Sequence, residues 1–385
     1  MFFSKKQEEK PSLPANLVDL RKDLKTRLKE VPMPGEVSLP RKDQQLLQKI
    51  RLKTSQLNAN NITRTKAYLD FYCLYPEIHW AFLGHMVSRN GGWNMTDLQG
   101  ELHARLLNKE KRHMFFSFLE RGNWLIFQDA YPQLLLFMES KRENKNMFYL
   151  LPYLNVSVFM EVVWNHYWKK EDRVLLAVAL IVNEQNYLEK RVMQKSLFQK
   201  QVFQTLEFAV QDLFSFNHLL FPFYMDGSSV EKAALVGVTL HHFDSLHERI
   251  RIGKRLYRLL FQDKTLLGKM FDWAIRNRHT GTRKDYWPHI FNDINEGIPG
   301  ARLTKRLKGC QLRKGEPRLY SPKLEFAWKN AEHSPAEVGD WFDCIDVIAY
   351  LRKENEMIDG EIMNEYCKTL ERLELAAIAK KAIFT

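Results

Sequence analysis

The chain of 385 residues is long enough for one large domain or two, and it carries a formal net charge of +12. Hydrophobic residues make up 45% of the chain and aromatic residues 12%, against 17 Gly and 14 Pro. This composition excludes a disordered, collagen-like or small disulfide-stapled protein, because so much aromatic surface has to be buried.

The N-terminal residues 1–41 are predicted to form an arm separate from the body. Leu17, Leu20, Leu24 and Leu28 share one helical face, and three prolines and a glycine then interrupt the pattern at 31–40. We expect a short amphipathic helix on a linker. It could dock on the body, on a partner or on a membrane surface, and the body is the favoured site.

Residues 42–280 are predicted to form a helical core, because apolar residues recur at spacings of three and four, as in 197–214. Gly91 and Gly92 are interpreted as a turn between two helices. Ser-x-x-Glu capping boxes at 228–231 and 334–337 predict helices that begin at 229 and 335. The predicted fold class is all-α, an irregular multi-helix array.

Residues 281–385 are predicted to contain a long basic loop near 280–320, followed by acidic helices packed on the core. Glycine and proline cluster at 281–317, and the last helix is expected over 359–383. The four cysteines are scattered, so we interpret them as reduced thiols, with Cys73 and Cys367 as packing residues. The longest apolar run, 174–182, is too short for a bilayer span of about 18 residues, and the N-terminus lacks a signal-peptide core, so a cytoplasmic location is expected.

The charge is segregated along the chain. Residues 251–330 hold 19 Lys and Arg against 7 Asp and Glu, whereas residues 331–385 hold 6 against 12. The densest basic stretch, 301–323, includes Arg302, Lys305 and Arg306. It predicts either a site for a polyanion such as nucleic acid or for an acidic protein, or a surface that is solvated or neutralised by the acidic tail.

Two further groups are candidates for anion binding. His85 and Arg89 share a helical face, but they also fit a core histidine and an arginine that caps helix carbonyls. The second group could present cations and backbone N–H groups to a phosphate and aromatic rings to a base, or it could be a helix end with buried aromatic anchors. Its members are His279, Arg283, Lys284, Tyr286 and Trp287.

Carboxylates and histidines within apolar helices are the candidates for catalysis. Glu161 and Glu184 would form an acid/base or metal pair if they met, with His241, His242 and His247 as further ligands. A polar helix face explains the same residues. No phosphate-loop, zinc or nucleophile motif is present, so no cofactor and no metal site is predicted.

Three aromatic-rich stretches resemble a known family: residues 61–98, FLERGNWLIFQDAYPQLL at 118–135 and TGTRKDYWPHIF at 280–291. They are similar to the uncharacterised YppC-like proteins of Bacillus and related Firmicutes, from about residue 43 to about residue 350. The resemblance implies a bacterial cytosolic protein without an assigned activity, and it transfers no functional residues.

The favoured hypothesis is a non-enzymatic helical protein that binds a phosphate-rich polyanion through residues 251–330. The alternatives are an acid/base or metal enzyme that uses the buried polar residues, and a structural scaffold.

Overall fold

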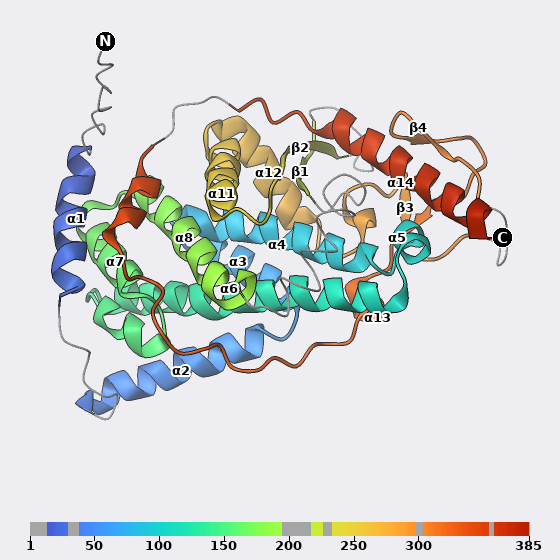
Figure 1. The fold of residues 1–385 in the computed structure, drawn as a ribbon. Helices are drawn as coiled ribbons and strands as arrows, with labels where there is room; N and C mark the ends of the chain where they lie inside the picture. Colours follow the sequence, from blue (N-terminus) through green and yellow to red (C-terminus); the bar gives the residue numbers. More distant parts are fainter. Residues whose placement is uncertain are drawn as a thin grey trace, which may run out of the picture.

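The computed structural model describes residues 14–29, 38–194, 217–225, 233–297, 303–353 and 358–384 (Figure 1). Helices account for 64% of the structure and strands for 7%, so the predicted all-α class is confirmed. The predicted helix at 197–214 and the capping box at 228–231 lie outside the described residues.

The N-terminal half is built of helices that pack around one apolar helix. Helix α8 (Arg173–Leu188) is buried over the whole run 175–183, as expected for a helix that is apolar on every side. It contacts the helices in front of and behind it in the chain. The helices up to this point are α1 (Ala15–Arg27), α2 (Arg41–Leu57), α3 (Asn61–Leu74), α4 (His79–Asp97), α5 (Glu101–Leu106), α6 (Lys109–Arg142), η2 (Phe148–Leu154), α7 (Val158–Lys170), α8 and the π-helical turn η3 (Glu189–Met193).

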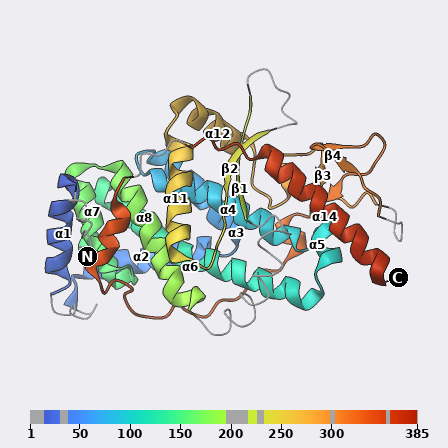
Figure 2. The ribbon, with the colours of Figure 1, turned by 45° about the horizontal axis from the view of Figure 1, so that its top comes forward.

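The C-terminal half mixes helices with short strands. Its elements are β1 (His218–Phe223), β2 (Ala234–Thr239), α11 (Leu246–Phe261), α12 (Lys264–Arg276), η5 (Arg283–Asp285), β3 (Phe291–Asn292), β4 (Leu307–Lys308), β5 (Gln311–Leu312), β6 (Leu319–Tyr320), α13 (Leu324–Ala327), η6 (Ile345–Leu351) and α14 (Met363–Phe384). Helices α1 and α14 lie at opposite ends of the molecule (Figures 1 and 2).

The predicted N-terminal helix docks on the body, as favoured. Leu17, Leu20 and Leu24 are fully buried in α1, which packs against α7 and η6. The three leucines follow the spacing of one helical face, so their burial accounts for the position of the helix.

Strands β1 and β2 replace part of the predicted helical core. They pair antiparallel, with Leu220 opposite Gly237 and Phe221 opposite Val236, and Figure 2 shows the pair between α12 and α14. The helical prediction was wrong here, because periodicity alone does not distinguish a short apolar strand from a buried helix. Pro222, within β1, is a residue that a helix interior disfavours.

Gly91 and Gly92 do not form a turn, because α4 continues through both. A Cβ at position 92 would lie 2.3 Å from Asn61 Oδ1 and 2.4 Å from His279 Nε2. Glycine therefore allows α3 and the segment after α12 to approach α4 closely.

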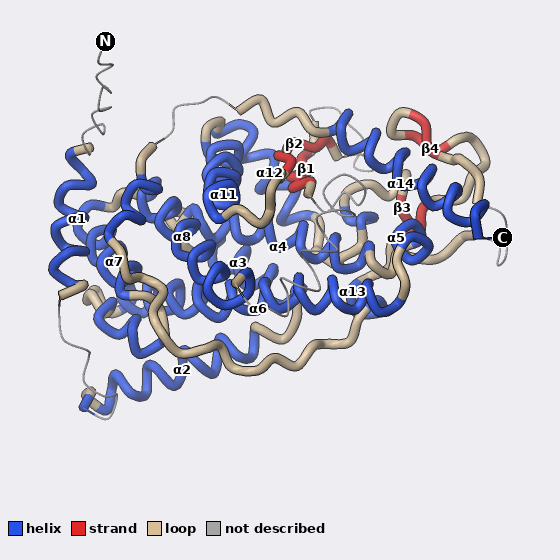
Figure 3. The backbone as a smooth tube through the Cα atoms, in the orientation of Figure 1, coloured by secondary structure: helices blue, strands red, loops and turns tan. Residues whose placement is uncertain are grey.

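The predicted helix at 335 is also absent, and residues 328–344 run as an extended strap along the outside of the helices (Figure 3). Its backbone carbonyls are bound by side chains from the body. Arg121 donates to the Ser334 carbonyl at 2.7 Å, and Arg191 donates to the Gly339 carbonyl at 2.6 Å. These arginines satisfy carbonyls that a helix would otherwise satisfy internally.

The acidic C-terminal helix is confirmed as α14. It contacts α5 and β4, and a disulfide between Cys310 and Cys367 joins it to the turn between β4 and β5. The Cα atoms of these cysteines are 5.2 Å apart, within the range for a disulfide. The interpretation of these two cysteines as reduced thiols was therefore wrong, while Cys73 and Cys344 are free.

One cluster of buried apolar side chains extends from Leu17 to Ala377. The proposed boundaries at 42 and 281 remain predictions. None of the described helices is long and apolar enough to cross a membrane.

Candidate functional site

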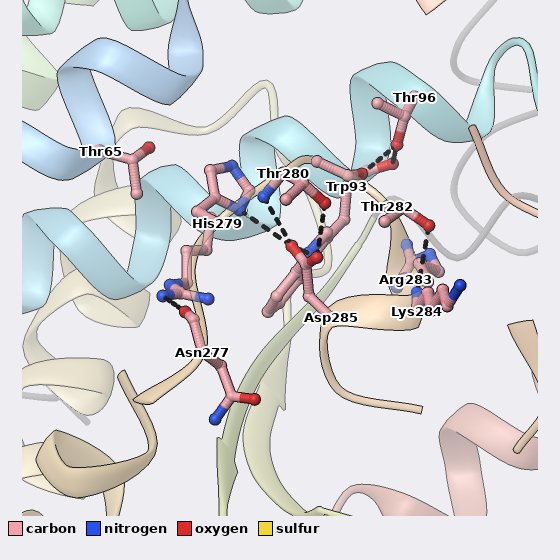
Figure 4. Close-up of polar contacts among 12 residues, drawn as sticks. Thr65, Trp93, Thr96, Asn277, His279, Thr280, Thr282, Arg283, Lys284 and Asp285 are labelled. Atoms are coloured by element: carbon pink, nitrogen blue, oxygen red, sulfur yellow. Dashed lines mark hydrogen bonds and ion pairs between the residues drawn. The ribbon is translucent and has the colours of Figure 1, made fainter. Parts of the chain in front are cut away.

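The loop after α12 is fixed by a network around Asp285 (Figure 4). Asp285 accepts hydrogen bonds from the Thr280 hydroxyl at 2.6 Å and the Thr280 backbone N–H at 2.9 Å. His279 places Nδ1 3.5 Å from the same carboxylate and its Nε2 2.8 Å from Asn61 Oδ1. His279 is therefore hydrogen-bonded through Nε2, while its Nδ1 lies beside the carboxylate without a hydrogen bond to any described residue, and burial lowers its pKa.

Arg283 is the centre of a second, buried network. Its Nε lies 2.6 Å from Asp97 Oδ2, and Nη1 donates to the hydroxyls of Tyr286 and Tyr366 at 2.7 and 2.9 Å. Burial opposes the charge of Arg283, but Asp97 and the two tyrosines outweigh it and raise the pKa of the guanidinium well above its ordinary value. This arginine holds three separate segments together.

The aromatic residues of this loop face the core. Tyr286 and Trp287 are 2% and 0% exposed, and the Trp287 indole donates to the Ala233 carbonyl at 2.9 Å. Lys284 pairs with Asp293. Four of the five residues predicted to bind a phosphate and a base are therefore buried, and only Lys284 is partly exposed. Tyr286 and Trp287 fit the alternative of buried aromatic anchors.

His85 and Arg89 are also internal. His85 Nδ1 bonds to the Thr65 carbonyl at 2.8 Å, and Arg89 Nε donates to His85 Nε2 at 2.9 Å. Arg89 also donates to the carbonyls of Ala274 and Asn277 at the end of α12. This pair fits the structural alternative, a core histidine beside an arginine that caps a helix.

Some of the cations in the basic stretch 301–323 are paired with acidic residues. Arg306 is 3% exposed and pairs with Glu101 and Glu374, and Lys305 lies 3.5 Å from Glu371. Because Glu371 and Glu374 belong to α14, the acidic helix neutralises part of the basic stretch. Arg302 lies outside the described residues.

The predicted acid/base and metal residues are dispersed. Glu161 pairs with Arg27 of α1 at 3.0 Å, whereas Glu184 is hydrogen-bonded to Gln185. His241, His242 and His247 are exposed. Within the described ranges, no three His, Cys, Asp or Glu side chains come together as metal ligands.

A cavity of about 290 Å³ lies among α3, α4, α6, α8, β1 and α11. Its lining is mostly apolar, and four glycines, Gly84, Gly91, Gly122 and Gly253, contribute to it. Apolar walls come from Trp80, Leu83, Phe115, Phe118, Ile181 and Leu256. Such a lining with a few polar groups is typical of small-molecule sites.

Two polar groups of α3 border this cavity without satisfying their hydrogen-bonding capacity. Tyr68 is 3% exposed, and its hydroxyl has no hydrogen-bond partner among the described residues. Arg64 lies one turn earlier on the same helix and pairs with Glu120 at 2.5 Å, while its Nε has no partner there. Buried polar groups normally have partners, so an unpaired hydroxyl on a residue that lines a cavity is consistent with a ligand site.

Glu184 is one of two acidic residues that line this cavity, with Asp244. Gln185 Nε2 donates to Glu184 Oε1 at 2.7 Å, and both Gln185 and the nearby Trp80 side chain lower the pKa of the carboxyl group. Burial nevertheless dominates and raises the pKa of Glu184 to about 7. The carboxyl group can therefore gain or lose a proton near neutral pH.

Comparison with known proteins identifies the family. The family described as "Protein of unknown function (DUF2515)" matches residues 56–374. The chain belongs to the DUF2515 family. It is 42% identical over 240 residues to the uncharacterized protein YppC of Bacillus subtilis (strain 168), an alignment that covers 62% of this chain and 72% of YppC. No solved structure matches the chain.

The membership of this DUF2515 protein confirms the predicted resemblance to YppC-like proteins and adds no functional residue to the cavity. Sequence reasoning singled out Glu184 but missed Tyr68, Trp80 and the glycines of the lining. Their signal is weak, since an aromatic residue and a glycine in helical sequence are ordinarily packing residues. Only the convergence of several helices brings them together.

Proposed function

We propose that this protein binds an apolar small molecule in the cavity between α3, α4, α6, α8 and α11. The observation that carries the proposal is the mostly apolar lining, which includes Tyr68, whose hydroxyl has no hydrogen-bond partner among the described residues. The ligand is expected to present mainly hydrocarbon or aromatic surface and one group able to hydrogen-bond with Tyr68.

The cost of the cavity supports this function. Protein interiors are close-packed, and a void in the core destabilises the fold in proportion to its volume. A glycine inside a helix is also less stable than alanine by roughly 0.5–1 kcal/mol. At Gly122 in α6, an added Cβ would meet no described atom within 4 Å, so packing does not require glycine there. Ligand binding explains both features.

The proposal is tested by filling the cavity from Gly122. The neutral dye N-phenyl-1-naphthylamine brightens in apolar sites, and its titration is compared between wild type, Gly122→Phe and a control. The control is Gly268→Phe, because Gly268 also lies within a helix, is exposed and has no described atom within 4 Å of an added Cβ. Circular dichroism and thermal melting check that each variant is folded.

We expect one saturable site in wild type and in Gly268→Phe, and at least about tenfold weaker binding in Gly122→Phe. Gly122→Leu serves as a smaller filling variant if the phenylalanine disturbs α6. Equal dye binding by both folded variants, or no saturable binding by wild type, would overturn the proposal.

Acid/base catalysis by Glu184 is the second candidate function. It is favoured by one observation, the carboxyl group with a pKa near 7 that lines the cavity, which suits a general acid or base. If a cavity ligand is converted, turnover should be lost in Glu184→Gln while binding persists. Unchanged turnover in that variant would exclude this role.

A further inference from the structure

We propose that the ligand of this cavity is an apolar organic cation, whose positive charge is bound by Glu184 beside the aromatic side chains of Trp80 and Tyr68. This inference rests on the proposed function and specifies the chemical class of the ligand.

The charge balance of the lining favours a cation. Both arginines of the lining are already neutralised by carboxylates outside it: Arg64 pairs with Glu120, and Arg249 pairs with Glu189. Glu184 has no cationic partner among the described residues. Asp244 also lines the cavity and is exposed. The uncompensated charge of the lining is therefore negative, which favours a cation.

The orientation of Gln185 is set by Arg249 and keeps its amide nitrogen toward Glu184. Arg249 Nε can only donate, and it lies 3.0 Å from Gln185 Oε1. The amide nitrogen of Gln185 must then point to Glu184, as the 2.7 Å hydrogen bond requires. Gln185 stabilises the ionised carboxylate without neutralising it. The chain thus keeps an acceptor for a cation at this position.

Aromatic surface lines the cavity together with the carboxylate. Trp80 and Tyr68 pack edge to face with ring centroids 5.4 Å apart, and both line the cavity. Trp80 on α4 and Glu184 on α8 both line the cavity, and the indole lowers the pKa of the carboxyl group, so it lies close enough to favour the ionised form. Aromatic rings attract organic cations through their negative faces, and tryptophan does so most strongly. A carboxylate with such neighbours favours an apolar cation over a hydrated metal ion.

The test uses two probes of nearly identical shape that differ in charge. Phenyltrimethylammonium carries a positive nitrogen where tert-butylbenzene has a carbon. The affinity of each probe is measured by its competition with N-phenyl-1-naphthylamine for wild type and for Glu184→Gln at pH 8. We expect Glu184→Gln to weaken the cation about tenfold and to change the affinity for the neutral probe less than about twofold.

A second measurement needs no substitution. Lowering the pH from 8 to 5.5 should weaken the cation in wild type, because protons compete for Glu184, and leave the neutral probe unchanged. The other titratable and charged groups around this carboxyl are Tyr68 of α3, Asp129 of α6 and Arg249 of α11, with Arg191 acting on Asp129. Protonation of Asp129 over the same pH range could change the shape of the cavity, and such a change would alter the affinity for the neutral probe as well.

The outcomes separate the two proposals. If the dye does not bind wild type, the proposed function fails. The cation inference is overturned if the dye binds and the two probes compete with it equally well, in wild type and in Glu184→Gln and at both pH values. The cavity would then still bind ligands, so the proposed function would stand.

Discussion

Gln185 and Glu184 are joined by a 2.7 Å hydrogen bond in which the amide nitrogen of Gln185 donates to the carboxyl group. Because Arg249 Nε donates to the amide oxygen of Gln185, the amide nitrogen is fixed in the orientation that points to Glu184. The pair places a titratable group on an apolar cavity wall. Several measurable properties depend on it.

Replacing Glu184 by Gln should change how stability depends on pH. The folded-state pKa of Glu184, about 7, lies above the ordinary value of 4.5, so the folded protein binds more protons than the unfolded chain between these values. This contribution to the unfolding free energy is lost as the pH rises through that window. Glu184→Gln removes the loss, so the variant should gain roughly 1–2 kcal/mol relative to wild type between pH 5 and pH 8.

Urea denaturation across this pH range measures the difference. The matched control is Glu325→Gln, on the exposed surface of α13, which should leave the difference from wild type independent of pH. Asp129, whose pKa burial also raises to about 7, contributes to both wild type and variant. A difference between Glu184→Gln and wild type that stays constant with pH would show that Glu184 is not a desolvated carboxyl group.

Arg283→Met should be strongly destabilising. It leaves Asp97 buried without its partner and removes the bonds to Tyr286 and Tyr366. Loss of one member of a buried pair costs about 3–5 kcal/mol. Arg276→Met is the control, because it removes an exposed pair with Asp272 and should cost less than about 1 kcal/mol. Equal losses in chemical denaturation would contradict the central role of Arg283.

Thiol titration tests the pairing of Cys310 with Cys367. In denaturant without reductant, wild type should show two reactive thiols, from Cys73 and Cys344, and Cys310→Ser should show three. Because 57 residues separate the paired cysteines, reduction should lower the unfolding free energy by up to about 4 kcal/mol. Four reactive thiols in the unreduced wild type would show that the disulfide does not form.

Polyanion binding remains the untested hypothesis for the basic stretch. Its exposed cations in the structure are Lys308, Arg313 and Lys314. We expect weak retention on heparin, with little change when these three residues become Glu. Arg306→Glu is unsuitable for the test, since it would place a carboxylate against Glu374. Strong retention that salt weakens and the triple reversal abolishes would favour a polyanion partner.

Much of the helical architecture could be predicted from sequence. The helical spacing of the leucines in α1 predicts one buried face, and the continuous apolar run of α8 predicts a helix buried on all sides. Both predictions agree with the observed burial. The helix predicted to begin at residue 335 does not form, because contacts with the body of the protein stabilise an extended segment there. A capping-box pattern is present at Ser334, but Arg121 and Arg191 bind the carbonyls of the extended chain instead.

For the candidate sites, too, the sequence predicts some features, whereas others depend on contacts that only the fold creates. Composition shows that residues 251–330 are basic, but only the fold shows that Arg306 meets Glu374, a residue 68 positions away. Gly92 illustrates the same limit, since a glycine that forms a turn and one that permits close packing look alike in sequence. Glu184 could be singled out as a costly carboxylate in an apolar helix, whereas its neighbours Tyr68 and Trp80 could not.

Calorimetric titration of wild type, Gly122→Phe and Gly268→Phe with N-phenyl-1-naphthylamine at several temperatures tests the central claim most directly. The account predicts one site per chain in wild type and Gly268→Phe, with a negative heat-capacity change from apolar burial, and a much weaker site in Gly122→Phe. Unsaturable binding, or an identical site in all three proteins, would contradict it.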